Sequence, residues 1–232
     1  MYKFGKYKAS DTMSSLITEN YRMLLVISRF GIALGFGDKT IGEVCRENRV
    51  DVATFLAIVN MLLDEDGAAS YAEAAFSVAS LISYLRNSHD YFLNFRLPAI
   101  RTNLKAILNK EKDELSQAIL NYFDEYVTEV RKHMTYEEET VFPYVRALLA
   151  GQRRDDYAIA VFSRQHDHVS ARLTEFKNII IKYYPAKSTN EVNSVLFDIF
   201  NCENDLASHN AIEDCLFVPA IAELENKNNT GS

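Results

Sequence analysis

Apolar residues recur at intervals of three and four through most of the chain, which is the period of an amphipathic α-helix. Four long stretches carry this pattern, at about 76–108, 114–149, 155–183 and 190–224. The polar segments NKEKD, AGQRRD and YYPAKSTN separate them, and in the last one Ser188 and Glu191 fit a capping box that opens a helix. Four long helices joined by short links predict an all-α fold, an up-down-up-down four-helix bundle.

The segment ahead of these stretches predicts three shorter helices. Asp11 can cap a helix that runs toward Arg29. Thr40 and Glu43 match the capping box of a second helix, and Asp51 can cap a third, VATFLAIVNMLL. Pro and Gly number only 4 and 8, which also favours helices over turn-rich sheets.

A composition change separates the two helical regions. The run LDEDGAAS is acidic and rich in small residues, as connectors between domains often are. We therefore predict a small helical domain at 1–70, a bundle domain at 71–226 and a disordered tail at 227–232. The two domains are expected to fold separately.

Histidine and glutamate interrupt the apolar stripes of the four long stretches. The residues with inward spacing are Ile82, Leu85, His89 and Phe92; Phe123, Tyr126, Val130, His133, Glu137 and Val141; Phe162, His166, Val169, Leu173 and Phe176; and Ile199, Leu206, His209, Glu213 and Leu216. All follow three- and four-residue spacing, so these polar side chains are predicted to face the core.

The polar residues also form a repeat. A His-Asp pair is followed 43 or 44 residues later by a histidine with a glutamate four positions on, and this pattern occurs twice. The first copy contains His89, Asp90, His133 and Glu137, and the second contains His166, Asp167, His209 and Glu213. The copies are offset by 76 to 77 residues, so each corresponds to one pair of helices.

A metal ion would compensate for burying these groups, because unpaired buried carboxylates and imidazoles each cost several kcal/mol. A histidine and a glutamate at i and i+4 share one helix face, and both can reach an ion in the bundle centre. Imidazole with carboxylate suits iron or manganese, and bundle cores hold di-iron carboxylate sites. The predicted ligands are His89, His133, Glu137, His166, His209 and Glu213.

Each residue also has a purely structural interpretation. A single HxxxE is usually a surface ion pair, and a single histidine on an apolar face usually packs in a core, but two copies in register favour metal binding. Glu138 and Glu139 leave the inward face and are expected to be solvated. Asp90 and Asp167 point sideways, which fits either support of a ligand or a surface position.

Two further choices concern neighbouring side chains. His168 lies about 200° around the helix from His166, on a polar face with Arg172, so His166 is predicted to be the ligand. Cys202 can face the bundle interior and Cys215 lies off the stripe; packing is the expected role of both.

Charge and cysteine content restrict the function. The formal net charge is −7, and residues 1–70 hold eight lysines and arginines against nine aspartates and glutamates. If that segment were a DNA-binding helix-turn-helix, it would lack the excess of positive charge that attracts DNA phosphates, so no nucleic-acid partner is expected.

Three cysteines without close spacing favour reduced thiols and a cytoplasmic location. The run MLLVISRFGIALGFG is short and contains Arg29, so no membrane association is expected.

The motifs HDYFLNFRLP, HMTYEEETVFP, QHDHV and HNAIEDCLFVP resemble the hemerythrin-like domain of the repair-of-iron-centres proteins, a di-iron family. The resemblance covers residues from about 76 to 224. It implies a centre of two non-haem iron ions with an oxo or hydroxo bridge, held by four histidines and two bridging glutamates. The corresponding histidines are His89, His133, His166 and His209, and the bridging carboxylates are Glu137 and Glu213.

The resemblance implies a role in repairing iron–sulfur clusters damaged by nitric oxide or oxidative stress. The implied partners are damaged iron–sulfur proteins and the small ligands oxygen and nitric oxide, and a homodimer is compatible with it. The segment from Arg29 to Asn60 resembles the small domain that precedes hemerythrin in many of these proteins. There the family carries a Cys-Cys pair, and this chain reads LGFG instead.

An alternative function is reversible binding or sensing of oxygen or nitric oxide. Four histidines and two bridging glutamates give each iron about four protein ligands against roughly six for an octahedral ion, which leaves positions open for a small ligand. Repair and sensing differ in whether the iron leaves the protein.

Overall fold

The computed structural model describes residues 7–64, 76–108, 113–152, 157–164, 167–185 and 189–230. Regular structure in these ranges is helical, apart from one isolated β-bridge between Thr12 and Thr40. The predicted all-α class is therefore confirmed. Residues 1–88 with 211–232 form one compact unit, and residues 89–210 form the other.

Short helices make up the described part of the N-terminal segment, and all but the second begin with a side-chain cap. They are α1 (Met13–Glu19), α2 (Met23–Arg29), α3 (Ile41–Glu47) and α4 (Val52–Leu63). The side chains of Thr40 and Glu43 form a reciprocal capping box at the start of α3. The carboxylate of Asp51 accepts a hydrogen bond of 2.8 Å from the backbone N–H of Thr54 at the start of α4. Both predicted caps are therefore confirmed.

The single helix predicted from Asp11 to Arg29 is wrong, because the chain forms two helices there. The cap of α1 is Thr12, whose hydroxyl accepts from the N–H of Ser15. Helix α1 ends at Asn20, whose side-chain amide donates to the hydroxyl of Tyr7 at 2.9 Å. The backbone of Asn20 is non-helical, with φ −140° and ψ 78°, and the bond to Tyr7 holds its side chain there, so the chain breaks between α1 and α2.

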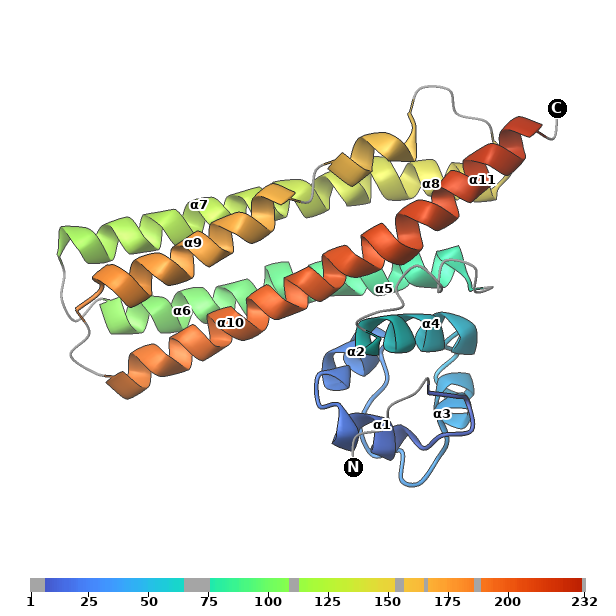
Figure 1. Ribbon diagram of the computed structural model, residues 1–232, viewed down its shortest axis with the longest axis horizontal. Helices are drawn as coiled ribbons and strands as arrows, with labels where there is room; N and C mark the ends of the chain where they lie inside the picture. The colour runs from blue at the N-terminus through green and yellow to red at the C-terminus, as the bar shows by residue number, and fades with distance from the viewer. Residues whose placement is uncertain are drawn as a thin grey trace. The chain divides into compact units, whose positions relative to one another are not determined.

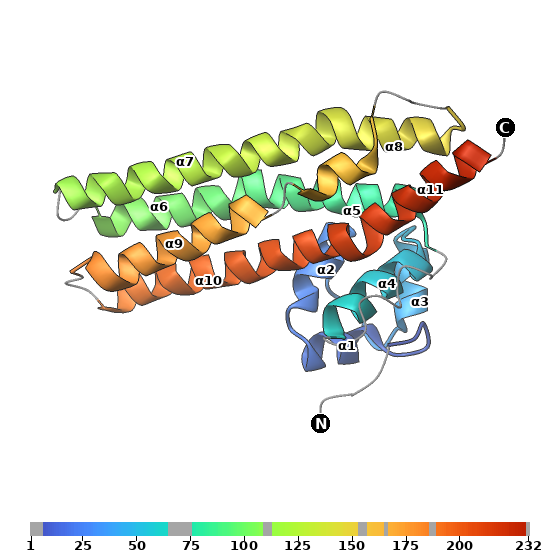
Figure 2. The ribbon, with the colours of Figure 1, turned by 45° about the horizontal axis from the view of Figure 1, so that its top comes forward.

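The rest of the chain forms four successive helical segments, each called a rod below, and the third consists of two helices that are described on either side of residues 165 and 166. The first rod contains α5 (Val78–Asp90), η2 (Tyr91–Arg96) and α6 (Leu97–Leu108); the second contains α7 (Glu114–Tyr136), η3 (Glu137–Val141) and α8 (Phe142–Leu149); the third contains η4 (Ile159–Arg164) and α9 (Asp167–Tyr183); and the fourth contains α10 (Thr189–Ile212), η5 (Glu213–Phe217) and α11 (Val218–Thr230). In the second compact unit, α6, α7, α9 and α10 run in alternating directions (Figures 1 and 2).

Three of the rods contain a π-helical segment in which the turn widens. Each segment closes with a hydrogen bond from the N–H of one residue to the carbonyl five positions earlier: Leu97 to Phe92, Phe142 to Glu137, and Val218 to Glu213. A proline follows at once in every case: Pro98, Pro143 and Pro219. Proline has no N–H and its ring crowds the carbonyl four residues earlier, so a widened turn accommodates it better than a regular one. This explains the repeated pattern of a glutamate six residues ahead of a proline.

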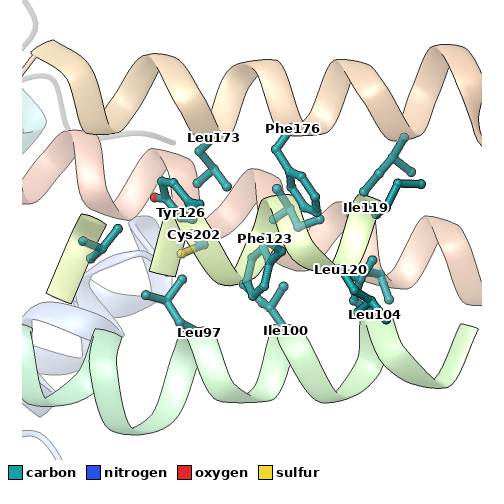
Figure 3. Close-up of a cluster of buried hydrophobic side chains, with 14 of the residues drawn as sticks. Leu97, Ile100, Leu104, Ile119, Leu120, Phe123, Tyr126, Leu173, Phe176 and Cys202 are labelled. Atoms are coloured by element: carbon teal, nitrogen blue, oxygen red, sulfur yellow. The ribbon is translucent and has the colours of Figure 1, made fainter. Parts of the chain in front are cut away.

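The core of the second unit lies among all four of its long helices (Figure 3). Its members include Leu97, Ile100 and Leu104 of α6, Ile119, Phe123 and Tyr126 of α7, Leu173 and Phe176 of α9, and Ile199 and Cys202 of α10. The rings of Phe123 and Phe176 lie 5.3 Å apart between α7 and α9. Cys202 is fully within this core, as its spacing predicted. Among the helices of the described ranges, none has both the length and the apolar character of a membrane span.

The domain boundary predicted near residue 70 falls within residues 65–75, which lie outside the described ranges, and it stays a prediction. Within the first compact unit, the N-terminal helices contact α5. The rings of Phe30 and Tyr84 lie 4.9 Å apart, and the side-chain amide of Asn87 donates to the carbonyl of Arg29 at 2.6 Å.

At the other end of the chain, helix α11 continues to Thr230. Residues 227–230 of the tail that was predicted to be disordered, 227–232, are therefore helical.

Replacing Phe176 by Ala should lower the free energy of unfolding by about 3–5 kcal/mol, because the ring is fully buried and its loss leaves a cavity. The matched control is Phe197→Ala in α10, a ring that is 68% exposed, which should change it by less than about 1 kcal/mol. Urea denaturation followed by circular dichroism measures both. Equal effects of the two substitutions would contradict the assigned core.

The thiols should react in an order set by their burial. Burial raises the pKa of the Cys45 thiol to about 12, so at pH 8 only about one molecule in 10⁴ carries the reactive thiolate. Burial and Asp214 also raise the pKa of Cys215, but its side chain is only half-buried. Iodoacetamide should label Cys215 first, and Cys45 only after denaturant is added. Peptide mass spectrometry at timed intervals checks this, and equal labelling rates in the folded protein would contradict it.

Candidate metal centre

Two helices bring a histidine and a glutamate to the same buried face. His133 lies in the last turn of α7 and Glu137 opens η3, while His209 lies in the last turn of α10 and Glu213 opens η5. Spacing of four residues places each pair one turn apart, on one side of its rod. His89 comes from the end of α5.

Four of these side chains form a compact set of possible metal ligands. His89, Glu137, His209 and Glu213 are all buried, with exposed fractions of 3% or less. Each offers one nitrogen or oxygen, and these atoms all lie within 4.8 Å of one another. Two imidazoles and two carboxylates form a donor set that suits iron or manganese. The donors present therefore fit the kind of ion that the sequence predicts.

Glu137 lies between two histidines and directs one oxygen to each. Its Oε2 lies 2.9 Å from Nε2 of His89, and its Oε1 lies 2.9 Å from Nε2 of His133. The two imidazoles come from different rods. A carboxylate whose two oxygens face two separate histidines has the arrangement needed to bridge two ions, each bound by one of those histidines.

The surroundings of Glu137 keep it ionised. Burial alone would raise the pKa of this carboxyl, but hydrogen bonds and charge from His133 and His89 outweigh burial and hold the pKa well below its usual range. Glu137 is therefore a carboxylate at neutral pH, the form that binds a metal ion. A bound cation would give this buried carboxylate a further positive partner.

Aromatic rings hold the histidines in place. The His89 ring stacks on Phe142 with centroids 5.6 Å apart and planes 9° from parallel. His209 meets the edges of His89 and Phe92 at 5.2 Å and 5.9 Å. These contacts restrict ring rotation and surround the donor atoms with apolar surface.

His133, a further predicted ligand, faces the Glu137 oxygen that is not directed to His89. His133 is partly buried, with 11% of its side chain exposed, and stacks on Phe162 at 6.3 Å. His166 lies outside the described residues, and the side chain of His168 is likewise outside them. The choice between those two histidines therefore stays a prediction.

The expectation that Glu138 leaves the inward face is wrong. Its Oε1 lies 3.0 Å from Nδ1 of His89, and only 28% of its side chain is exposed. Glu138 follows the residue that opens η3, and a π turn spreads more residues over each turn than the regular helix on which the expectation was based. A carboxylate beside the ligand glutamate, ahead of a proline, was the sequence signal for this contact. Glu139 is exposed, as expected.

Asp90, next to the predicted ligand His89, lies at the surface. Asp90 is exposed and accepts a hydrogen bond of 2.7 Å from the side-chain amide of Asn94, one helical turn further on. It therefore occupies the surface position, one of the two that the sequence allowed. The side chain of Asp167 lies outside the described residues.

Comparison with known families agrees with this donor set. The model of the hemerythrin HHE cation-binding domain matches residues 80–221, which is more than half of the chain and includes every predicted ligand. No curated protein matches the chain. A cation-binding helical bundle is thus supported by the fold, by the grouped histidines and glutamates, and by the family match. The chain belongs to the hemerythrin HHE cation-binding domain family.

Proposed function

We propose that this protein holds two iron ions. His89 and His209 would bind one ion, and His133 with His166 would bind the other. Glu137 and Glu213 would bridge them. The observation that carries this proposal is Glu137, whose two oxygens face Nε2 atoms of histidines from two rods at 2.9 Å. The duplicated His-Asp and HxxxE pattern supports the same stoichiometry, because each copy provides ligands from two helices.

The proposed role of the centre is repair of iron–sulfur clusters damaged by nitric oxide or oxidants. This role rests on the resemblance of the four ligand motifs to the repair-of-iron-centres proteins. Bound iron would supply open coordination positions and one-electron redox chemistry. The protein's part is to hold the ions through side chains on rigid rods and to surround them with Phe92, Phe142 and Phe162, all buried rings.

A second candidate function is reversible binding or sensing of oxygen or nitric oxide. The composition of the N-terminal segment favours it, because LGFG replaces the Cys-Cys pair of the repair family. The cysteine closest in sequence to that place, Cys45, is buried with a raised pKa and is not suited to thiol chemistry. A sensor would keep its iron through many cycles, whereas a repair protein that donates iron would lose it.

An iron-transfer experiment distinguishes repair from sensing. Iron-loaded protein is mixed with an apo iron–sulfur enzyme, sulfide and reductant, with and without a chelator that removes free iron. Repair by iron donation predicts recovery of enzyme activity together with loss of iron from this protein. Retention of iron, together with a spectral change that nitric oxide causes and gas removal reverses, would support sensing and overturn the repair role.

The ligand assignment predicts that the protein carries about two iron ions per chain and that the double substitution Glu137→Ala and Glu213→Ala removes most of them. Both carboxylates are fully buried, so no solvent-exposed group takes their place. Iron is measured by plasma emission spectrometry on protein loaded anaerobically. The matched control is Glu139→Ala, an exposed residue next to the site, which should keep full iron. Two tightly bound ions in the double variant would contradict the bridging role.

The third rod should supply its ligand through His166 rather than His168. His166→Ala should lower iron to about half or less, because one ion loses a histidine, while His168→Ala should leave the iron content unchanged. Each variant serves as the control for the other, since the two differ by one position on either side of Asp167. Loss of iron in His168→Ala alone would overturn both the helix phase and the alignment of the repeat.

A further inference from the structure

Glu138 contacts His89, a predicted metal ligand, at the ring nitrogen that does not face Glu137. Its Oε1 lies 3.0 Å from Nδ1 of His89, while Nε2 of the same ring lies 2.9 Å from Glu137. The imidazole is therefore held between two carboxylates, one on each nitrogen. The two glutamates are adjacent in the sequence at the start of η3, so one short segment reaches both sides of the ring.

This arrangement fixes which nitrogen of His89 is available to a metal ion. A neutral imidazole has one N–H and one lone pair. With a metal ion bound, the N–H would be on Nδ1, where it donates to the Glu138 carboxylate, and the lone pair on Nε2, the nitrogen 2.9 Å from Glu137, would be left for the ion. Metal-binding histidines commonly donate their second N–H to a carboxylate, which orients the ring and makes it a stronger donor.

Two features make Glu138 suited to such a role. Its side chain is 28% exposed, so it stays hydrated in part and does not add a third fully buried carboxylate to the core. The face of His89 is covered by Phe142, stacked at 5.6 Å, so the ring cannot easily tilt away from the carboxylate. Phe142 is also the residue whose N–H closes the π segment on Glu137.

We propose that Glu138 is a positioning residue for the metal centre, which holds His89 with Nε2 directed inward and strengthens it as a ligand. The inference rests on the proposed metal-binding function and adds a residue to it. Glu138 would act on the ion that His89 binds, and would make that ion harder to remove and harder to reduce, because an anionic partner increases electron donation by the imidazole.

The test compares four proteins: the wild type, Glu138→Ala, Glu138→Gln and the control Glu139→Gln. The Ala variant removes the acceptor, the Gln variant keeps an acceptor oxygen without the charge, and the control removes a charge one residue away at an exposed position. Thermal unfolding of the metal-free proteins checks that each variant folds. The rate at which a chelator removes iron and the midpoint potential of the iron-loaded protein are then measured.

Loss of Glu138 should weaken iron binding about 10- to 100-fold in the Ala variant, with a smaller loss in the Gln variant. The midpoint potential should become more positive in the same order. The Glu139→Gln control should match the wild type in both measurements. A Glu138→Ala protein with the wild-type chelation rate and potential would overturn the inference while leaving the metal-binding function intact.

A second readout uses the metal-free protein, so that failure of the proposed function is distinguishable from failure of this inference. Histidine-selective ¹⁵N labelling reports the protonation of each ring nitrogen, and a His89→Gln variant assigns the His89 signals. The wild type should show Nδ1 of His89 protonated and hydrogen-bonded, and Glu138→Ala should change that Nδ1 signal while Glu139→Gln does not. A wild type that binds no iron would refute the proposed function, whereas an unchanged Nδ1 signal of His89 in Glu138→Ala would refute the role of Glu138.

Discussion

The burial of two carboxylates in the middle of a helical bundle is the constraint on which this structure depends. Glu137 and Glu213 are fully inaccessible, and a charged carboxylate in an apolar interior is unfavourable by several kcal/mol unless it has partners. Histidines provide those partners: His89 and His133 lie 2.9 Å from Glu137 and keep its pKa low. Glu137 is thereby held in the form and place that a cation requires, and binding of a cation would stabilise the fold.

The backbone is adapted to the same constraint through its prolines. A proline stands six residues after each buried glutamate, and the glutamate carbonyl accepts the hydrogen bond that closes the widened turn before it. The proline therefore fixes where the π segment ends, and the segment begins at the glutamate. Because π segments shift the angular position of the residues within them, adjacent side chains can reach different sides of one partner. Glu137 and Glu138 do so around His89.

Much of this arrangement follows from residue spacing, and the remainder depends on tertiary contacts. The three- and four-residue period placed His89, Glu137 and His209 in the core, because a regular helix keeps such positions on one face. The capping residues Thr40 and Asp51 were predictable, because their bonds are local. The break at Asn20 was not, because its side chain bonds to Tyr7, thirteen residues away. The contact of Glu138 escaped prediction because helical angles were extended through a segment that is not an α-helix.

The first rod has the same π segment followed by a proline, but it carries an apolar residue at the position where the second and fourth rods have a glutamate. It also has a proline that follows a π segment, but the residue whose carbonyl closes the turn is Phe92 rather than a glutamate. Phe92 is fully buried and meets His209 at 5.9 Å, so at this equivalent position the chain places an apolar ring against a predicted ligand. A third carboxylate there would add negative charge beside the grouped histidines and glutamates. With phenylalanine instead, the carboxylates of the compact donor set are those of Glu137 and Glu213.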